Sequence, residues 1–155
     1  MKFRMVSRTS AIPNNMLVYR ADEFSFDTEP APVAGFTSIL VNDLNLEVDD
    51  AGRVISVWGV CPHMQWKRAS LTPPVADVGE AFVISEAPLK RGVSTRINPQ
   101  NRWSALADPT SGWICIKSEN VPDSATEILS GVILGTSQGG DFCSIWLRPE
   151  HFPKM

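Results

Sequence analysis

Three cysteines and two histidines are the side chains of this sequence best suited to chemistry, and one of each type meets in Cys61-Pro62-His63. A thiol and an imidazole two positions apart could act as nucleophile and base, or as two ligands of a metal ion. Structural zinc sites use about four such ligands. The remaining candidates, Cys115, Cys143 and His151, lack the close pairing that zinc motifs show. We therefore expect no metal site and no cofactor, with Cys61 packed in the core and His63 in a loop.

Covalent catalysis at this corner has little support in the sequence. A reactive thiolate needs an adjacent base or a helix N-terminus, and the pattern indicates neither around the cysteines. The chain has no Gly-x-Ser-x-Gly elbow, and the stretch 131–140 lacks the lysine and the glycine spacing of a phosphate-binding loop. We expect a protein that is not an enzyme. An enzyme that uses Cys61 and His63 stays as an alternative hypothesis.

Five tryptophans offer a second route to function. Trp58 and Trp113 fall in apolar runs typical of strands, where core packing is the ordinary role, whereas Trp66 and Trp103 have less regular surroundings that suit a cleft. One alternative is therefore a small β-barrel that holds an apolar ligand in a pocket lined by Trp58, Trp66, Trp103 and Trp113. Stacking on nucleic acid is disfavoured, because such surfaces carry a basic groove and this chain has a formal charge of -3.

The distribution of charge is more informative than its sum. No lysine or arginine occurs between Ala21 and Gly52, and that stretch carries -8 through Asp22, Glu23, Asp27, Glu29, Asp43, Glu47, Asp49 and Asp50. The other nine acidic residues stand against all 14 basic ones, so the rest of the chain carries +5. Runs of like charge are often only a solvated face. The functional alternative is a docking surface for a basic protein, with Asp22, Glu23, Asp27, Glu29, Glu47, Asp49 and Asp50 as the expected contact residues.

Short apolar segments between prolines and glycines indicate strands. The clearest is 44–48, whose leucines and valine alternate with polar residues, and the turn Asp50-Ala51-Gly52 leads from it into a partner strand, 53–60, that ends near Pro62. Further strands are expected at 2–7, 16–20, 36–41, 66–71, 80–85, 93–97 and 112–117. The last should be central, because both of its faces are apolar. The acidic, proline-bearing stretch 21–35 is interpreted as an irregular surface segment anchored by Phe24 and Phe26.

The segment 122–134 fits two structures. Asp123 and Glu127 suit the start of a helix over 122–129, but Gly131 and Gly135 oppose a long helix. We prefer a strand over 126–134 followed by a glycine-rich turn and a second strand over 142–147. The expected fold class is therefore mainly β, with a β-rich α+β fold as the alternative, built from antiparallel hairpins in a sandwich or a partly open barrel.

Length and composition favour one compact domain spanning residues 1–155. The N-terminus carries charges where a signal peptide needs an apolar core, and no apolar run approaches the roughly 18 residues of a membrane span. We therefore expect a cytoplasmic protein that does not bind membranes. An odd number of cysteines, each inside an apolar segment, indicates reduced and buried thiols.

Three segments together resemble a known family: Gly-Arg-Val-Ile-Ser-Val-Trp-Gly at 52–59, Asp-Pro-Thr-Ser-Gly-Trp-Ile-Cys-Ile at 108–116, and Ile-Trp-Leu-Arg-Pro at 145–149. In general character they are similar to the small cytosolic immunity proteins of bacterial contact-dependent growth inhibition and related polymorphic toxin systems. The resemblance implies a non-catalytic inhibitor that binds one toxin domain, commonly a nuclease, in a toxin–antitoxin complex. Many such toxins are basic because they approach nucleic acid, and an acidic surface would imitate the phosphate field that they recognise. The expected partner is thus a toxin protein, with no direct binding of nucleic acid.

Overall fold

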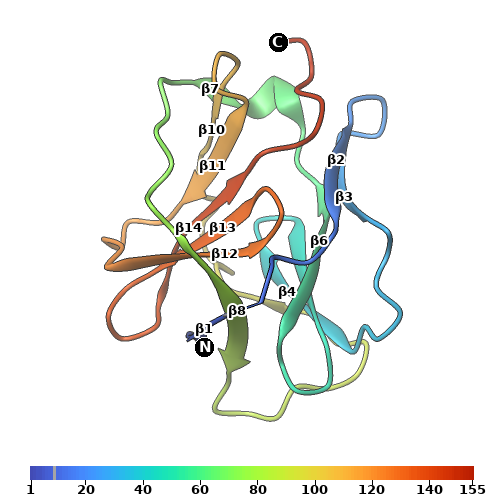
Figure 1. Ribbon diagram of the computed structural model, residues 1–155, viewed down its shortest axis with the longest axis vertical. Coiled ribbons are helices and arrows are strands. Elements are labelled where there is room, and N and C mark those ends of the chain that lie inside the picture. Colours follow the sequence, from blue (N-terminus) through green and yellow to red (C-terminus); the bar gives the residue numbers. More distant parts are fainter. Residues whose placement is uncertain (9) are drawn as a thin grey trace.

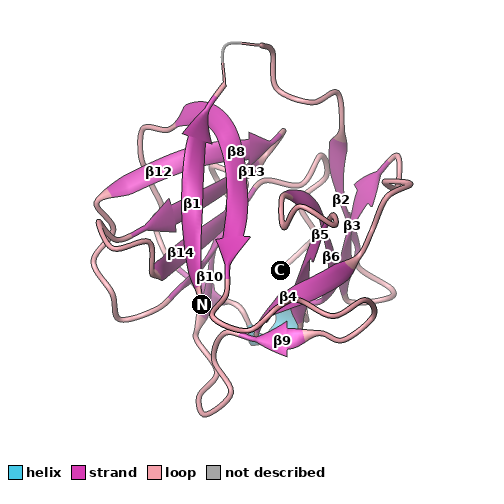
Figure 2. Ribbon diagram, turned by 90° about the horizontal axis from the view of Figure 1, so that it is seen from below, coloured by secondary structure: helices cyan, strands magenta, loops and turns pink. Residues whose placement is uncertain are grey.

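The strands of the protein form two sheets that face each other (Figure 1). The computed structural model describes residues 1–8 and 10–155. Within these residues the larger sheet has eight strands, in the order β1 (Lys2–Ser7), β8 (Asp77–Ile84), β12 (Ser124–Leu129), β13 (Val132–Thr136), β14 (Phe142–Leu147), β11 (Trp113–Lys117), β10 (Ala105–Asp108) and β7 (Lys67–Arg68). The smaller sheet has six, in the order β2 (Met16–Arg20), β3 (Ser25–Glu29), β6 (Val54–Val60), β5 (Leu44–Val48), β4 (Thr37–Val41) and β9 (Thr95–Arg96). Figure 2 shows the larger sheet on the left and the smaller one on the right.

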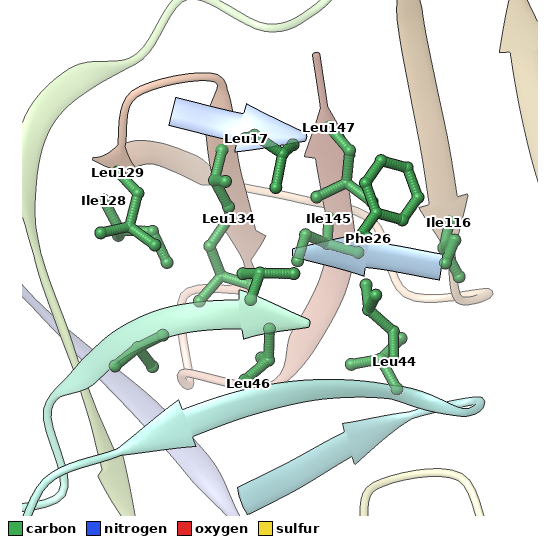
Figure 3. Close-up of a cluster of buried hydrophobic side chains, with 14 of the residues drawn as sticks. Leu17, Phe26, Leu44, Leu46, Ile116, Ile128, Leu129, Leu134, Ile145 and Leu147 are labelled. Carbon is green, nitrogen blue, oxygen red and sulfur yellow. The ribbon is translucent and has the colours of Figure 1, made fainter. Parts of the chain in front are cut away.

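The hydrophobic core lies between the sheets and takes side chains from both (Figure 3). Leu44 and Leu46 of β5 have no exposed surface, while Asn45 between them points to the other face of the sheet. Full burial of a leucine side chain stabilises the fold by about 1.5–3 kcal/mol. The facing sheet supplies Ile116, Leu134, Ile145 and Leu147. Two apolar inner faces in contact make a β-sandwich.

Backbone contacts tie the two sheets into one compact domain. Arg53, which directly precedes β6, forms an antiparallel bridge with Phe82 of β8. After β14 the chain crosses to the smaller sheet, where the Glu150 N–H donates to the Leu17 carbonyl at 2.8 Å. Most strand pairs are antiparallel; the parallel ones are β8 with β12, β7 with β10, and β4 with β9.

The predicted fold class is confirmed: the chain is mainly β and forms a sandwich of two sheets. The hairpin expected over 44–60 is β5 and β6, with a positive φ of 81° at Gly52 in its turn. The strand expected at 112–117 is β11 and is central, since it lies between β14 and β10.

The interpretation of 21–35 as irregular is wrong for its middle, which is strand β3. Phe26 is 1% exposed and Thr28 is 3% exposed, whereas Asp27 between them faces outward. Phe24, expected to anchor the segment, is 37% exposed and lies in the β2–β3 turn with a positive φ of 55°. The period-two pattern of β3 was present in the sequence but was masked by its acidic composition.

Other boundaries also differ from the predictions. The strand expected at 66–71 is only Lys67–Arg68, and the one at 93–97 is only Thr95–Arg96, because each lies at a sheet edge. A helix over 122–129 is wrong, since 124–129 is strand β12. The preferred strand over 126–134 is interrupted by a turn, where Gly131 has φ 78°. Strand β10 was not predicted.

The helical content described is a single turn of 3-10 helix, η1 (His63–Gln65), which follows the proline that ends the β6 segment. No helix of the described residues has the length and apolar character needed to cross a membrane.

Candidate docking surface

The acidic residues between 21 and 52 do not form one patch. Asp22 and Glu23 lie exposed in the β2–β3 turn, at the end of β6 where Ser25 pairs with Val60. Asp50 is exposed in the β5–β6 turn, at the opposite end of β6. Seven strand residues span roughly 20 Å. The two turns therefore present their charges at opposite ends of the smaller sheet.

Asp49 has a structural position. Its carboxylate accepts hydrogen bonds from the N–H groups of Ala51 (3.0 Å) and Arg53 (2.9 Å), and from the Arg53 side chain at 3.2 Å. The residue is only 8% exposed. Asp49 therefore fixes the β5–β6 turn, and its charge is directed into the loop.

Glu47 is also engaged within the chain. Its carboxylate accepts a hydrogen bond from the Ser56 hydroxyl at 2.8 Å, on the outer face of the smaller sheet. Gly35, in the connection between β3 and β4, passes so close that a Cβ atom there would overlap the carboxylate. The connection thus covers Glu47 and this half of the outer face.

Arginines from outside the acidic stretch neutralise several of its charges. Arg20 forms ion pairs with Asp27 at 3.9 Å and with Glu29. Asp43 accepts from Arg102 at 2.5 Å and from Arg96 at 3.3 Å, and the Arg102 hydrogen bond is the main cause that lowers the pKa of Asp43. Four of the eight carboxylates of the run, those of Asp27, Glu29, Asp43 and Asp49, are therefore paired with arginine once the chain folds.

The uncovered half of the outer face carries an exposed tryptophan. Trp58, in β6, is 42% exposed, and Val60 on the same side of that strand is 48% exposed. The register places Asp27 of β3 beside Trp58 and Val18 of β2 opposite Asp27. We call these four residues the Trp58 face. It adjoins the β2–β3 turn, where Asp22 and Glu23 are exposed.

The other tryptophans lie apart from Trp58. Trp66 and Trp103 line a cavity of about 100 Å³, as the cleft hypothesis expected, but it is smaller than the roughly 300–1,000 Å³ of a small-molecule site. Trp113 lies on the outer face of the larger sheet, with its ring 6.4 Å from that of Trp146. In the part of the chain that the structure describes, no cavity is lined by all four tryptophans of the predicted pocket.

The largest recess has a volume of about 770 Å³ and lies where the chain crosses from β14 to β2. Trp113, Arg148 and Glu150 contribute to its wall, together with Glu29 and Glu127. The Arg148 guanidinium lies 5.9 Å from the centre of the Trp113 ring. Arg20 binds Glu29, and Glu127 accepts from the Gly131 N–H at 3.4 Å. The wall thus holds carboxylates and a guanidinium together, which leaves no clear preference for a ligand of either charge.

The three cysteines are free and buried, which confirms the prediction of reduced thiols in the core. Burial raises the pKa of Cys61 to about 11 and of Cys115 to about 12. The Cys61 sulfur accepts a hydrogen bond from the Trp66 indole at 3.3 Å, whereas His63 contacts Tyr19. The thiol and the imidazole of this corner are therefore directed to different partners. Among residues 1–8 and 10–155, no group of three or more His, Cys, Asp or Glu side chains is placed to hold a metal ion.

The sequence pattern predicts core packing for Trp58, whereas the structure exposes its side chain on the outer face of the smaller sheet. The signal was present in the expected hairpin: if Leu44, Leu46 and Val48 face inward, the residues opposite Asn45 and Glu47 must face outward. The structure pairs Asn45 with Trp58 and Glu47 with Ser56. Register, rather than hydrophobicity, decides which side of the sheet the indole occupies.

Comparison with known proteins adds no relative: the sequence matches no family model and no curated protein.

Proposed function

We propose that this protein is a non-catalytic binding protein that docks a basic protein domain on the Trp58 face, and that its partner is a bacterial toxin domain which it neutralises. The observation that carries the proposal is the exposure of Trp58 on an outer sheet face, beside the carboxylate of Asp27. Tryptophan is enriched among the residues that dominate binding energy at protein interfaces.

Charge supports a basic partner. Asp22 and Glu23 extend the Trp58 face with exposed carboxylates, and the ion pairs among the described residues do not include them. Such carboxylates steer a cationic partner toward the surface, and they affect the association rate and partner choice more than the affinity. An indole next to a carboxylate also suits an arginine or lysine side chain, which can stack on the ring and pair with the charge.

Of the contact residues expected from the sequence, the proposal keeps Asp22, Glu23 and Asp27. Glu29 lies at the far end of β3, beside the 770 Å³ recess. Glu47 and Asp49 are engaged within the chain, and Asp50 lies at the opposite turn. Toxin neutralisation rests on the family resemblance of the sequence together with this acidic and aromatic surface.

The test is co-expression with the toxin domain encoded beside this gene, followed by measurement of the Kd of the purified pair. Trp58→Ala should raise the Kd by roughly 30-fold or more, the cost of losing about 2 kcal/mol at a hot spot, and should abolish protection at low expression. Asp22→Lys with Glu23→Lys should slow association, most strongly at low salt. The matched controls are Val75→Ala, at a valine that is 99% exposed elsewhere, and the double reversal Glu86→Lys with Glu119→Lys.

Both sets of variants should keep a melting temperature close to that of the native protein, because the substituted side chains are exposed. Unchanged protection by Trp58→Ala together with an unchanged Kd would refute the docking surface. A gene neighbourhood that encodes metabolic enzymes instead of a toxin would refute the toxin partner.

A further inference from the structure

The Cys61-Pro62-His63 corner, which the docking proposal does not use, holds one imidazole in a defined orientation. The Tyr19 hydroxyl donates a hydrogen bond to the Cys61 carbonyl at 2.9 Å and accepts one from the His63 backbone N–H at 3.0 Å. The same oxygen lies 3.2 Å from Nδ1 of His63. A phenol has one proton to donate, and here the Cys61 carbonyl takes it. Nδ1 of His63 must therefore carry a proton and donate to Tyr19.

This arrangement leaves Nε2 of His63 as the ring nitrogen available to a ligand. His63 lies on the wall of an open recess of about 580 Å³, whose lining comes from residues 63–68 and from the C-terminal segment. The residues that line it are His63, Met64, Trp66, Arg68, Lys154 and Met155. The position of His63 is fixed from three sides, by Tyr19, by the Phe24 ring at 5.8 Å and by the Trp66 ring at 6.1 Å.

The charged side chains in the lining of the recess are all basic. Arg68 and Lys154 join His63 in its wall, and its lining contains no acidic side chain. The exposed carboxylates of Asp22 and Glu23 lie in the neighbouring β2–β3 turn and do not belong to the lining. One Arg68 nitrogen donates to the Met155 backbone oxygen at 3.0 Å, which holds the guanidinium beside the recess and leaves its other N–H groups for a ligand.

We infer that this recess binds a phosphate monoester. A guanidinium fork, an ammonium and an imidazole N–H are the donors that phosphate oxygens accept best, and charge-assisted hydrogen bonds of this kind are about twice as strong as neutral ones. The volume exceeds that of a phosphate ion alone. Met64, which is 67% exposed, and Met155 supply adaptable apolar walls for the organic group of an ester. With Nδ1 donating to Tyr19, His63 contacts the phosphate through Nε2.

The experiment is a titration of the intact protein with inorganic phosphate and with phenyl phosphate at constant ionic strength, followed by the NMR signals of the two histidine Cε1–H groups. We expect the His63 signal to move with saturation while the His151 signal stays in place, and phenyl phosphate to bind more tightly than inorganic phosphate. Arg68→Gln and Lys154→Gln should each weaken binding about tenfold, the loss of one charge-assisted hydrogen bond. Lys90→Gln and Lys117→Gln, at exposed lysines outside the recess, are the matched controls.

A His63 signal that responds to neither probe overturns the inference, as does equal weakening in the control variants, which would indicate non-specific screening. Equal affinity for the two probes would identify free phosphate as the ligand and overturn the assignment of an ester. Failure here leaves the docking proposal untouched, since Trp58→Ala changes neither His63 nor the charges of the recess.

Discussion

Thr28→Val should destabilise the protein more than the loss of one hydroxyl group would suggest. The backbone ladder between β3 and β6 contains only the pairs Ser25–Val60 and Phe26–Gly59. Beyond it the Thr28 hydroxyl donates to the Val57 carbonyl at 2.8 Å and accepts from the Val57 N–H at 3.0 Å. One side chain thus replaces the missing rungs of the ladder and keeps β3, with Asp27, beside the strand that carries Trp58.

The size of the destabilisation follows from the two backbone groups of Val57 that a valine at position 28 cannot hydrogen-bond. Val57 has no exposed surface and Thr28 is 3% exposed, so the substitution leaves the buried N–H and the buried carbonyl of Val57 without hydrogen-bond partners. Each unsatisfied group costs about 1–3 kcal/mol, and the added methyl group recovers about 0.8 kcal/mol. We expect the free energy of unfolding to fall by about 3 kcal/mol. For a chain of this size that corresponds to a decrease in melting temperature of roughly 6–12 °C.

The assay is urea unfolding followed by tryptophan fluorescence, with Thr37→Val as the control. The Thr37 hydroxyl donates to the Val93 carbonyl at 2.6 Å, but Val93 is 55% exposed, so water can replace the lost donor. The control should lose about 1 kcal/mol or less. If Thr28→Val loses no more than Thr37→Val, the hydroxyl does not replace the ladder and the reasoning is refuted.

Three further predictions concern the remainder of the fold. Gly131→Ala should lower the free energy of unfolding by about 3 kcal/mol in denaturant melts, because φ is 78° and the new Cβ would lie 2.6 Å from the Arg148 carbonyl oxygen. The control Gly92→Ala, at φ 71° with open space around it, should lower it by about 1 kcal/mol. Equal losses in the two variants would contradict the overlap at Gly131. The hydrogen bonds and ion pairs from Arg102 and Arg96 lower the pKa of Asp43, so this carboxylate stabilises the fold at neutral pH and loses its contribution as pH falls below about 4. The difference in the free energy of unfolding between the native protein and Asp43→Asn should therefore narrow in acid. A difference that stays constant from pH 7 to pH 3 would contradict this prediction. The three thiols are buried, and burial raises the pKa of Cys61 to about 11 and that of Cys115 to about 12. They should therefore resist a thiol reagent at pH 8 until the protein is unfolded. Rapid labelling of the native protein would contradict this prediction.

The local sequence pattern predicts the fold best where the alternation of apolar and polar residues and the residues of the turn indicate the same structure. In the hairpin of β5 and β6, buried Leu44 and Leu46 alternate with Asn45, and Gly52 supplies the positive φ of the turn. Strand β3 shows where this reading fails, because its inward residues are one Phe and one Thr among acidic neighbours. Thr28 is buried only because its hydroxyl satisfies Val57, a partner 29 positions away. A local sequence pattern does not predict a contact between residues this far apart in the chain.

The recess at His63 could not be predicted from the sequence either, because its residues come together only through contacts between distant segments. The sequence singled out Cys61 and His63 because they are close along the chain. The fold instead pairs Cys61 with Trp66 and brings His63 to Tyr19, Arg68 and Lys154. Sheet topology sets these neighbours, since β2 and β7 belong to different sheets.

The net charge of a segment in the sequence differs from the charge that its folded surface presents to a partner. Between 21 and 52 the chain has no basic residue, yet Arg20 and Arg53, the first basic residues on either side, fold back to pair with Glu29 and Asp49. Arg96 of β9, and Arg102 in the connection from β9 to β10, reach Asp43. These arginines do not reach Asp22 and Glu23 at the β2–β3 turn, or Asp50 at the opposite turn, and Asp27 beside Trp58 is paired with Arg20 at 3.9 Å. A basic protein attracted to the β2–β3 turn finds an indole on the adjoining face, and so the aromatic side chain, rather than the number of acidic residues, should determine how long the complex lasts.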